Sequence, residues 1–303
     1  MSEFLYDFPE VIDNTMRTAW DSCEHKFLME HVHHFRHKKP SEHLVFGGSY
    51  AKGLEVMRLE FYKGEQNKVI YAGKAMLEVI REWDRNCDDP LLDYNKNLPN
   101  CLCALLYYLE TWPLHTDWIK PYGWKDHTDS VEFTFAIPLE IKHPVTGNPI
   151  LYAGRFDLLA DYASQPAVYD DKTTTQLGPS WIKQWGMNSQ MTGYIWAARQ
   201  HGYDTSTAII RGVSILKRGF GHSQAIEHRQ NWEIERWYNT MHKNLEDMIK
   251  AWERRAFSYS LGSSCGNYGG CPFAEMCRHE NWQQWIKTDF KIYKWNPLEI
   301  LPD

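Results

Sequence analysis

Two short segments decide the fold of this chain: GRFD at residues 154–157 and, twelve residues later, DDKT at residues 170–173. Apolar residues flank both segments and predict two neighbouring strands joined by a turn. Such a turn places Asp157 beside Asp170, with both side chains on the same face of the sheet. Two convergent carboxylates form an oxygen site of the kind that Mg²⁺ or Mn²⁺ prefers.

Lys172 adds a positive charge to this carboxylate pair. It stands two residues after Asp170, so both side chains project from one face of the strand. An ammonium there can orient an attacking water and stabilise charge on a phosphate, while the metal lowers the pKa of its bound water. The pattern therefore predicts metal-assisted phosphodiester hydrolysis. The alternative is that these charges are ordinary solvated residues at strand edges.

The remaining sequence predicts a mixed α/β protein with strands in the middle and helices on both sides. Helices are expected at residues 10–37, from Gly47-Gly48 to Phe61, and at 66–84, 98–112, 179–200 and 230–256. Strands are expected at residues 131–137, 150–159, 167–169, 206–216 and 222–229. Since no linker separates these elements, we expect one domain over residues 1–303. Its expected parts are a helical N-terminal insertion at about 55–128 and a core at about 129–230. A Cys-rich C-terminal loop follows from Ser258, and residues from about 258 to 285 form its cluster-binding tail.

The composition is that of an ordinary globular chain of 303 residues, with 43% hydrophobic and 24% charged residues. A net charge of −6 excludes a global basic field for nucleic acid, but a metal-binding carboxylate cluster is itself locally acidic. No apolar run approaches the roughly 18 residues that span a bilayer. The N-terminus, MSEFLYDFPE, is not a secretory signal. We therefore expect a cytoplasmic protein with no membrane partner.

Seven cysteines without an export signal indicate thiols or metal ligands rather than disulfides. Cys265, Cys271 and Cys277 lie in a Gly-rich polar loop, where glycine lets the backbone turn tightly and aim thiolates inward. Cys23, on a distant predicted helix, can complete a tetrahedral sulfur site. Four thiolates suit an iron–sulfur cluster or Zn²⁺, and buried free thiols are the alternative. The cysteines interpreted as structural are Cys87, Cys101 and Cys103.

Gln190 and Tyr194 are one turn apart on a predicted helix and share a face. Taken alone, they are most simply ordinary helix residues, although Gln can hold a lysine or phosphate and Tyr can stack on a base. With these residues the chain resembles the RecB-like nucleases of the PD-(D/E)XK superfamily, among them CRISPR-adaptation exonucleases and phage relatives. Members carry G-x-x-D, D-x-K-T and Q-x₃-Y in this order, matched here by residues 154–157, 170–173 and 190–194.

The resemblance implies a restriction-endonuclease-like fold, in which helices flank a mixed central sheet. It also implies a DNA exonuclease that depends on Mg²⁺ or Mn²⁺ and acts at single-stranded DNA ends, with recombination or replication proteins as candidate partners. The implied catalytic residues are Asp157, Asp170, Lys172, Gln190 and Tyr194, and the implied metal ligands are Asp157, Asp170 and the carbonyl of Asp171.

One branch of the family binds a [4Fe–4S] cluster with one N-terminal and three C-terminal cysteines. This chain resembles that branch, including the proline that follows the middle C-terminal cysteine. The implied cluster ligands are Cys23, Cys265, Cys271 and Cys277. The resemblance favours iron over zinc, which stays the alternative. A cluster closing so long a loop would stabilise the fold by removing entropy from the unfolded chain.

One departure from the family pattern leaves the activity open. The family places a histidine in F-G-x-x-x-H-x-x-L-E, whereas the matching residues 46–55 have Ala51 there. Glu55, one turn further along, is a candidate replacement. The alternative functions are a catalytically weak or inactive nuclease-fold module that binds DNA or protein, and a zinc-stabilised structural protein whose acidic residues are incidental.

Two further features have simple explanations. Glu132 is a candidate accessory carboxylate, but a solvated strand residue explains it as well. Helical spacing puts only some histidines of a His-rich stretch on one face, so the stretch is interpreted as solvated surface. Its histidines are His31, His33, His34 and His37.

Overall fold

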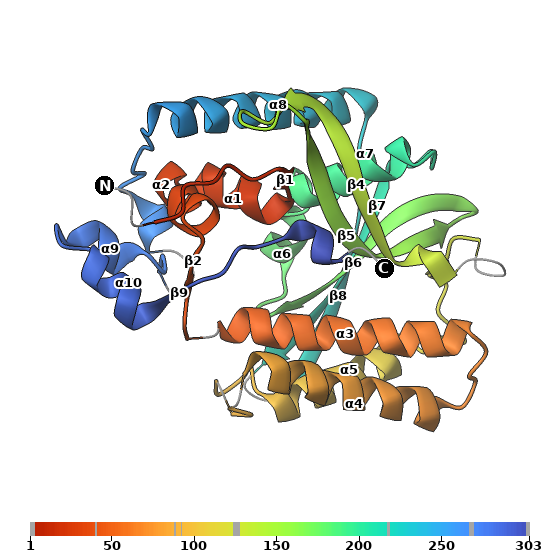
Figure 1. The fold of residues 1–303 in the computed structure, drawn as a ribbon. Coiled ribbons are helices and arrows are strands. Elements are labelled where there is room, and N and C mark those ends of the chain that lie inside the picture. The colour runs from red at the N-terminus through yellow and green to blue at the C-terminus, as the bar shows by residue number, and fades with distance from the viewer. Residues whose placement is uncertain are drawn as a thin grey trace. The chain divides into compact units, whose positions relative to one another are not determined.

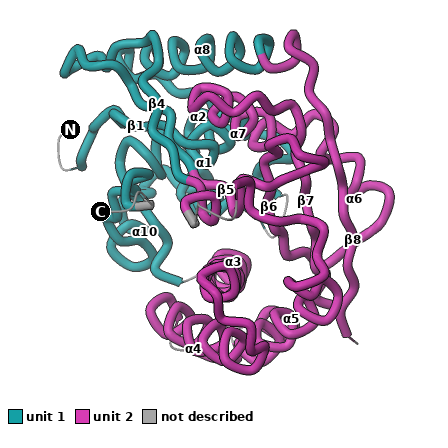
Figure 2. Tube along the Cα trace, turned by 90° about the vertical axis from the view of Figure 1, so that its right-hand side faces the viewer, with its two compact units in different colours: residues 1–39, 134–154, 235–303 teal, residues 40–133, 155–234 magenta. Residues whose placement is uncertain are grey.

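The chain forms two compact units in a computed structural model that describes residues 4–39, 41–87, 89–91, 93–123, 128–216, 219–266 and 270–300. Unit 1 comprises Met1–Lys39, Thr134–Gly154 and Glu235–Asp303, and unit 2 comprises Pro40–Phe133 and Arg155–Ile234 (Figure 2). Each unit is assembled from segments distant in sequence. That the whole chain is one domain stays a prediction.

Unit 2 contains most of the regular structure (Figure 1). Its helices are α3 (Glu42–Tyr62), α4 (Lys68–Asn86), α5 (Leu98–Thr111), the short η2 (Thr128–Ser130), α6 (Pro179–Lys183) and α7 (Ser189–Gln200). Its strands are β3 (Lys120–Pro121), β6 (Gln165–Thr174), β7 (Thr207–Leu216) and β8 (Gly219–His228). Strands β4 (Val131–Lys142) and β5 (Pro149–Tyr162) each run from one unit into the other.

The sheet of unit 2 is mixed. The last part of β5 pairs antiparallel with β6 from Leu158↔Tyr169 to Tyr162↔Gln165. Strand β6 pairs in parallel with β7 after a crossover through α6 and α7, and β7 pairs antiparallel with β8. Nearly every residue of β7 is buried, as expected of a strand covered on both faces. The mixed sheet with its helices confirms the predicted α/β class.

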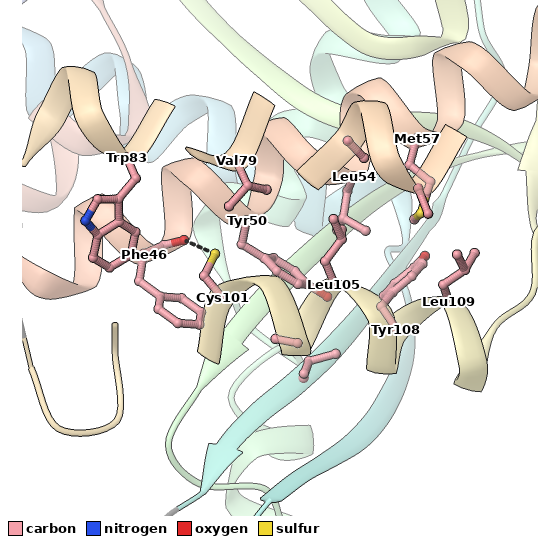
Figure 3. Close-up of a cluster of buried hydrophobic side chains, with 14 of the residues drawn as sticks. Phe46, Tyr50, Leu54, Met57, Val79, Trp83, Cys101, Leu105, Tyr108 and Leu109 are labelled. Atoms are coloured by element: carbon pink, nitrogen blue, oxygen red, sulfur yellow. Dashed lines mark hydrogen bonds between the residues drawn. The ribbon is translucent and has the colours of Figure 1, made fainter. Parts of the chain in front are cut away.

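Helices α3, α4 and α5 pack around a core that strand β7 completes with Val213 and Ile215 (Figure 3). Phe46, Tyr50 and Leu54 recur at intervals of four residues along α3 and are buried against α4 and α5. Gly53 permits this close approach, because a Cβ atom there would lie 2.6 Å from Val79 Cγ2. These helices confirm the helical segments predicted before the core.

The cysteines of this helical region differ in burial. Cys101 is buried and donates its Sγ–H to the carbonyl of Phe46 at 3.8 Å, and Cys87 is also buried. Both therefore pack as the structural residues that were predicted. Cys103 is exposed on α5, so it does not pack in the core, and its interpretation as a structural residue stays a prediction.

The elements of unit 1 come from both ends of the chain. They are β1 (Val11–Ile12), α1 (Asn14–Ser22), α2 (Glu24–Phe27), the π-helical η1 (Leu28–Val32), β2 (Phe35–His37), α8 (Asn231–Arg254, which begins in unit 2), η3 (Ser263–Cys265), α9 (Ala274–Arg278), α10 (Gln283–Asp289), β9 (Phe290–Ile292) and η5 (Pro297–Ile300). Strand β1 pairs in parallel with the first part of β5, and β2 pairs antiparallel with β9.

Several predicted elements have different bounds, and the strands expected at 131–137 and 167–169 are longer than predicted. The helix expected at residues 10–37 is broken at Cys23, where the backbone is extended. Just after the break, the N–H of His25 donates to the carbonyl of Ser258. The helix expected from Gly47 begins earlier, at Glu42, because both glycines lie inside it. Two further differences concern the helix expected at residues 179–200 and the C-terminal loop.

The helix expected at residues 179–200 is two helices. Asn188 begins a new one, since its side chain accepts the N–H of Met191 at 3.1 Å as an N-cap. The C-terminal loop expected from Ser258 contains α9, α10 and β9, which pack around Phe273 and Phe290. Within the described residues, no helix has the length and apolar character needed to cross a membrane.

Candidate functional site

Strands β5 and β6 stop pairing at the two aspartates. Their antiparallel register ends at Leu158↔Tyr169, and Asp157 and Asp170 are the next residues on the two strands. Asp170 still pairs with Ile210 of β7, so its backbone stays fixed in the sheet. The two acids therefore lie side by side where the strands end their pairing, as the turn between them predicted.

A cavity of about 290 Å³ in unit 2 opens at this point. Its lining comes from α3, β5, β6 and α7 and includes every residue that the sequence predicts for catalysis. The lining residues are Gly47, Tyr50, Ala51, Arg155, Asp157, Asp170, Asp171, Lys172, Thr173, Gln190 and Tyr194. Their meeting in one cavity is a property of the fold, and their individual roles stay predictions.

Hydrogen bonds fix the side chains of the cavity. Asp157 Oδ2 accepts the backbone N–H of Asp171 at 2.5 Å. Lys172 Nζ forms an ion pair with Asp170 Oδ2, a buried oxygen that accepts no well-aligned hydrogen bond from the described residues. On α7, Gln190 Nε2 donates to the hydroxyl of Tyr194 at 2.8 Å, one helical turn away. The carboxylate oxygens thus keep coordination capacity for a cation.

The electrostatics of the cavity also favour a cation. Burial raises the pKa of Asp157 well above its usual range, and the neighbouring Asp170 and Glu132 raise it further. Burial likewise raises the pKa of Asp170, with Lys172 opposing the shift. Burial alone would lower the pKa of Lys172, but Asp170 and Asp157 outweigh it and raise that pKa. A divalent ion bound here would reduce the repulsion between these neighbouring acids.

The donor set fits Mg²⁺ or Mn²⁺ better than a softer metal. It offers the carboxylate oxygens of Asp157 and Asp170, and Asp171 also lines the cavity. Among the described residues, no three His, Cys, Asp or Glu side chains are arranged to hold a metal ion. Mg²⁺ takes one or two carboxylates from a protein and completes its shell with water and phosphate.

Glu132, the candidate accessory carboxylate, raises the pKa of Asp157 but does not line the cavity. Its side chain is only 11% exposed and lies 2.8 Å from Arg155 Nε, so the interpretation as a solvated residue was wrong. Burial raises its pKa to about 7, and its backbone has a φ of +56°, which is strained for a residue other than glycine. The alternating pattern of apolar and polar residues along the strand did not indicate this burial or the strained backbone. Glu55, the candidate replacement for the family histidine, is paired with Lys52 at 2.7 and 2.8 Å.

The four predicted cluster cysteines meet in unit 1. Cys23, Cys265, Cys271 and Cys277 all line one cavity of about 320 Å³. The Cys271 N–H donates to the carbonyl of Cys265 at 2.9 Å, which folds the loop back on itself. Burial, together with the neighbouring Cys271 and Cys23 thiols, raises the pKa of Cys277 to about 11. The cavity therefore brings together cysteines from both ends of the chain, and their role as ligands stays a prediction.

The His-rich stretch is not a solvated surface. His31 and His34 are 2% and 3% exposed, whereas His33 is half-buried and only His37 is exposed. The π-helical turn of η1 brings His31 into the interior of unit 1, where both its ring nitrogens are buried without a hydrogen-bond partner among the described residues. The solvated interpretation was therefore wrong for His31 and His34.

Acid is expected to destabilise the fold through His31. Burial lowers its folded-state pKa to about 3, while the unfolded chain takes up a proton below about pH 6.5. The free energy of unfolding should therefore fall by roughly 1.4 kcal/mol per pH unit as the pH drops from 6.5 toward 3. Urea unfolding at several pH values measures this slope. His31→Phe should flatten it and His37→Gln should not, and equal slopes in both variants would refute the assignment.

Comparison with known proteins shows the family of the chain. A family model described as the PD-(D/E)XK nuclease superfamily matches residues 18–278. The chain therefore belongs to the PD-(D/E)XK nuclease superfamily. Its mixed sheet flanked by helices is the restriction-endonuclease-like fold that the sequence predicted.

Two solved structures are similar at a distance. A proposed exonuclease from Eubacterium rectale is 13% identical with a TM-score of 0.49, over 90% of this chain and 94% of that chain. The protein SSO0001 is 14% identical with a TM-score of 0.31, over 75% of this chain and 84% of that chain. A search of curated proteins gave no match. The assignment to the superfamily rests on the family model that matches residues 18–278, not on these two structures.

Proposed function

We propose that this protein is a DNA exonuclease that depends on Mg²⁺ or Mn²⁺ and acts at single-stranded ends. The observation that carries the proposal is the meeting of Asp157, Asp170 and Lys172 in one cavity of a chain from a nuclease superfamily. Two buried acids with raised pKa values beside a lysine suit a hydrolytic metal site. The high aromatic content, 15% of residues, motivates the preference for unpaired bases.

Each residue has a proposed part in hydrolysis. Asp157, Asp170 and the Asp171 carbonyl would hold the ion, which when bound lowers the pKa of a water and contacts the scissile phosphate. Lys172 would orient the attacking water and stabilise negative charge on the phosphate. The Gln190–Tyr194 pair on α7 would position Lys172 or the strand of DNA.

Release of nucleotides from end-labelled DNA tests this function. Single- and double-stranded substrates are compared with Mg²⁺, Mn²⁺ and chelator, and label at either end gives the polarity. We expect cleavage only with metal, and faster on single strands. Ala51, which lines the cavity where the family has a histidine, favours the alternative of a module that binds without cutting. DNA binding with no cleavage under any divalent ion would support that alternative and refute the exonuclease.

We further propose that Cys23, Cys265, Cys271 and Cys277 hold a [4Fe–4S] cluster, with Zn²⁺ as the alternative occupant. The support is their shared cavity and the sulfur-only donor set, which iron–sulfur clusters and structural zinc both use. Anaerobically purified protein should be brown and contain iron and inorganic sulfide. A colourless protein with one zinc per chain would favour zinc.

Cys271→Ser is expected to lower solubility and the melting temperature. Removing one of four ligands releases the bound group and frees the two ends of the chain, which a cross-link stabilises by about 2–4 kcal/mol. Cys103→Ser is the matched control, since Cys103 is exposed and lies outside the cavity. Differential scanning calorimetry and iron analysis of both variants measure the effect. Unchanged melting and full solubility of Cys271→Ser would contradict a structural cluster.

A further inference from the structure

A second layer of buried polar groups lies behind the cavity in unit 2. It centres on the carboxylate of Asp171, whose side chain is only 3% exposed. Asp171 Oδ1 accepts the hydroxyl of Tyr169 at 2.7 Å, and Asp171 Oδ2 accepts a hydrogen bond from Arg58 Nη2. Both oxygens of this carboxylate are thus bound within the protein, which leaves only the backbone of Asp171 for the cavity.

Arg58 reaches this carboxylate from α3. Its side chain is 3% exposed, and its guanidinium lies 4.9 Å from the ring centre of Tyr169. Arg58 Nη2 also donates to the hydroxyl of Tyr108 at 2.8 Å, on the helix shown in Figure 3. The hydroxyls of Tyr108 and Tyr169 are 3.0 Å apart. Through these hydrogen bonds, helices α3 and α5 fix the position of Asp171 on β6.

Stability does not explain this ion pair. Removing two charges from water costs about as much as their attraction returns, so apolar residues of similar volume often stabilise a protein at least as well. A buried ion pair does, however, impose direction on the groups it joins. Here the ion pair fixes Asp171, and the backbone N–H of Asp171 donates to Asp157 Oδ2 at 2.5 Å. On a strand, the N–H and carbonyl of one residue point to the same edge.

We propose that Arg58 is a positioning residue: by holding the Asp171 carboxylate, it sets the Asp171 peptide that orients Asp157. The inference rests on the proposed function, because it assigns Arg58 to the site that binds the divalent ion. Without Arg58 the Asp171 side chain is released, and the N–H that fixes Asp157 loses its direction. The ion would then bind less tightly, although every metal ligand remains.

A neighbouring ion pair supplies the control. Arg211 donates to Asp117 Oδ1 at 2.7 Å and to Oδ2 at 2.5 Å, and both side chains are at most 4% exposed. This pair resembles Arg58 and Asp171 in burial and charge. Arg211 Nη1 also donates to the Tyr108 hydroxyl at 3.4 Å, but the carboxylate of the pair lies on a different segment. The two double variants Arg58→Met/Asp171→Leu and Arg211→Met/Asp117→Leu therefore each replace one buried ion pair by apolar groups.

The test measures Mn²⁺ binding by isothermal titration calorimetry, together with kcat and KM on single-stranded DNA. Arg58→Met/Asp171→Leu should weaken Mn²⁺ binding by about 10–100-fold, as loss of groups that orient metal ligands does, and lower kcat more than KM changes. Arg211→Met/Asp117→Leu should bind Mn²⁺ within about twofold of the wild type. Tyr169→Phe removes only one hydroxyl donor to Asp171, so it should weaken Mn²⁺ binding less than Arg58→Met/Asp171→Leu does. It is the substitute test if that double variant does not fold.

Equal Mn²⁺ affinity in all variants, or an equal loss in both double variants, would overturn the positioning role and leave Arg58 a structural residue. A wild-type protein that neither binds Mn²⁺ nor cleaves DNA would instead refute the proposed function, and this inference with it. The two failures are distinguished by the wild type alone.

Discussion

Replacing Lys172 by alanine is expected to lower the rate of DNA cleavage by roughly 10²–10⁴-fold, the usual contribution of a positioned proton-transfer or charge-stabilising group. Lys172 is the cation that lines the cavity beside Asp170, to which its ammonium is paired. Its loss leaves the phosphate charge and the attacking water without that ammonium. Single-turnover rates on end-labelled single-stranded DNA measure the effect.

Metal binding separates this chemical role from a structural one. Lys172 competes with the ion for Asp170, so Lys172→Ala should bind Mn²⁺ at least as tightly as the wild type while it cleaves far more slowly. Lys183→Ala, which removes an exposed lysine from α6 outside the cavity, should keep the wild-type rate. Cleavage by Lys172→Ala at the wild-type rate would rule out the proposed mechanism.

The second large effect is expected for Asp157→Asn, which should abolish metal-dependent cleavage by at least about 10³-fold. An amide is a poor ligand for a hard divalent ion, and the ion supplies several kcal/mol of transition-state stabilisation. The amide oxygen can still accept the Asp171 N–H, so the local fold should persist. Asp161→Asn, on the same strand but outside the cavity, is the control.

The same variant should be more stable than the wild type without metal. Burial and neighbouring acids raise the folded-state pKa of Asp157, so this group stabilises the fold at low pH and that contribution is lost as the pH rises through the raised pKa. At pH 8 the neutral amide removes this cost, and we expect a melting temperature higher by roughly 2–4 °C. Mn²⁺ should raise the melting temperature of the wild type and leave that of Asp157→Asn unchanged. An equal rise in both would contradict the assignment of Asp157 as a ligand.

The sequence predicted the centre of this site well because its determinants are local. Asp157 and Asp170 stand the same distance from the turn between their strands, so strand pairing alone brings them together. The two-residue step to Lys172 and the four-residue step from Gln190 to Tyr194 follow the periods of a strand and a helix. The long helices α4, α5 and α8 were likewise predicted from their apolar periodicity.

Long-range contacts decided what the sequence could not predict. Arg58 lies on helix α3, and its neighbours in the sequence do not indicate that β6 supplies its partner. The break at Cys23 depends on a hydrogen bond to Ser258, 233 positions beyond its donor His25 in the chain. One error was avoidable: Gly186 and Asn188 are ordinary signals of a helix end and a new N-cap.

An anomalous difference map from crystals soaked in Mn²⁺ tests the central claim most directly. We expect one strong peak in the cavity of unit 2, at about 2.0–2.3 Å from oxygens of Asp157, Asp170 and the Asp171 carbonyl. A map with no peak there, or with Mn²⁺ held by other residues while these two aspartates stay unliganded, would contradict it.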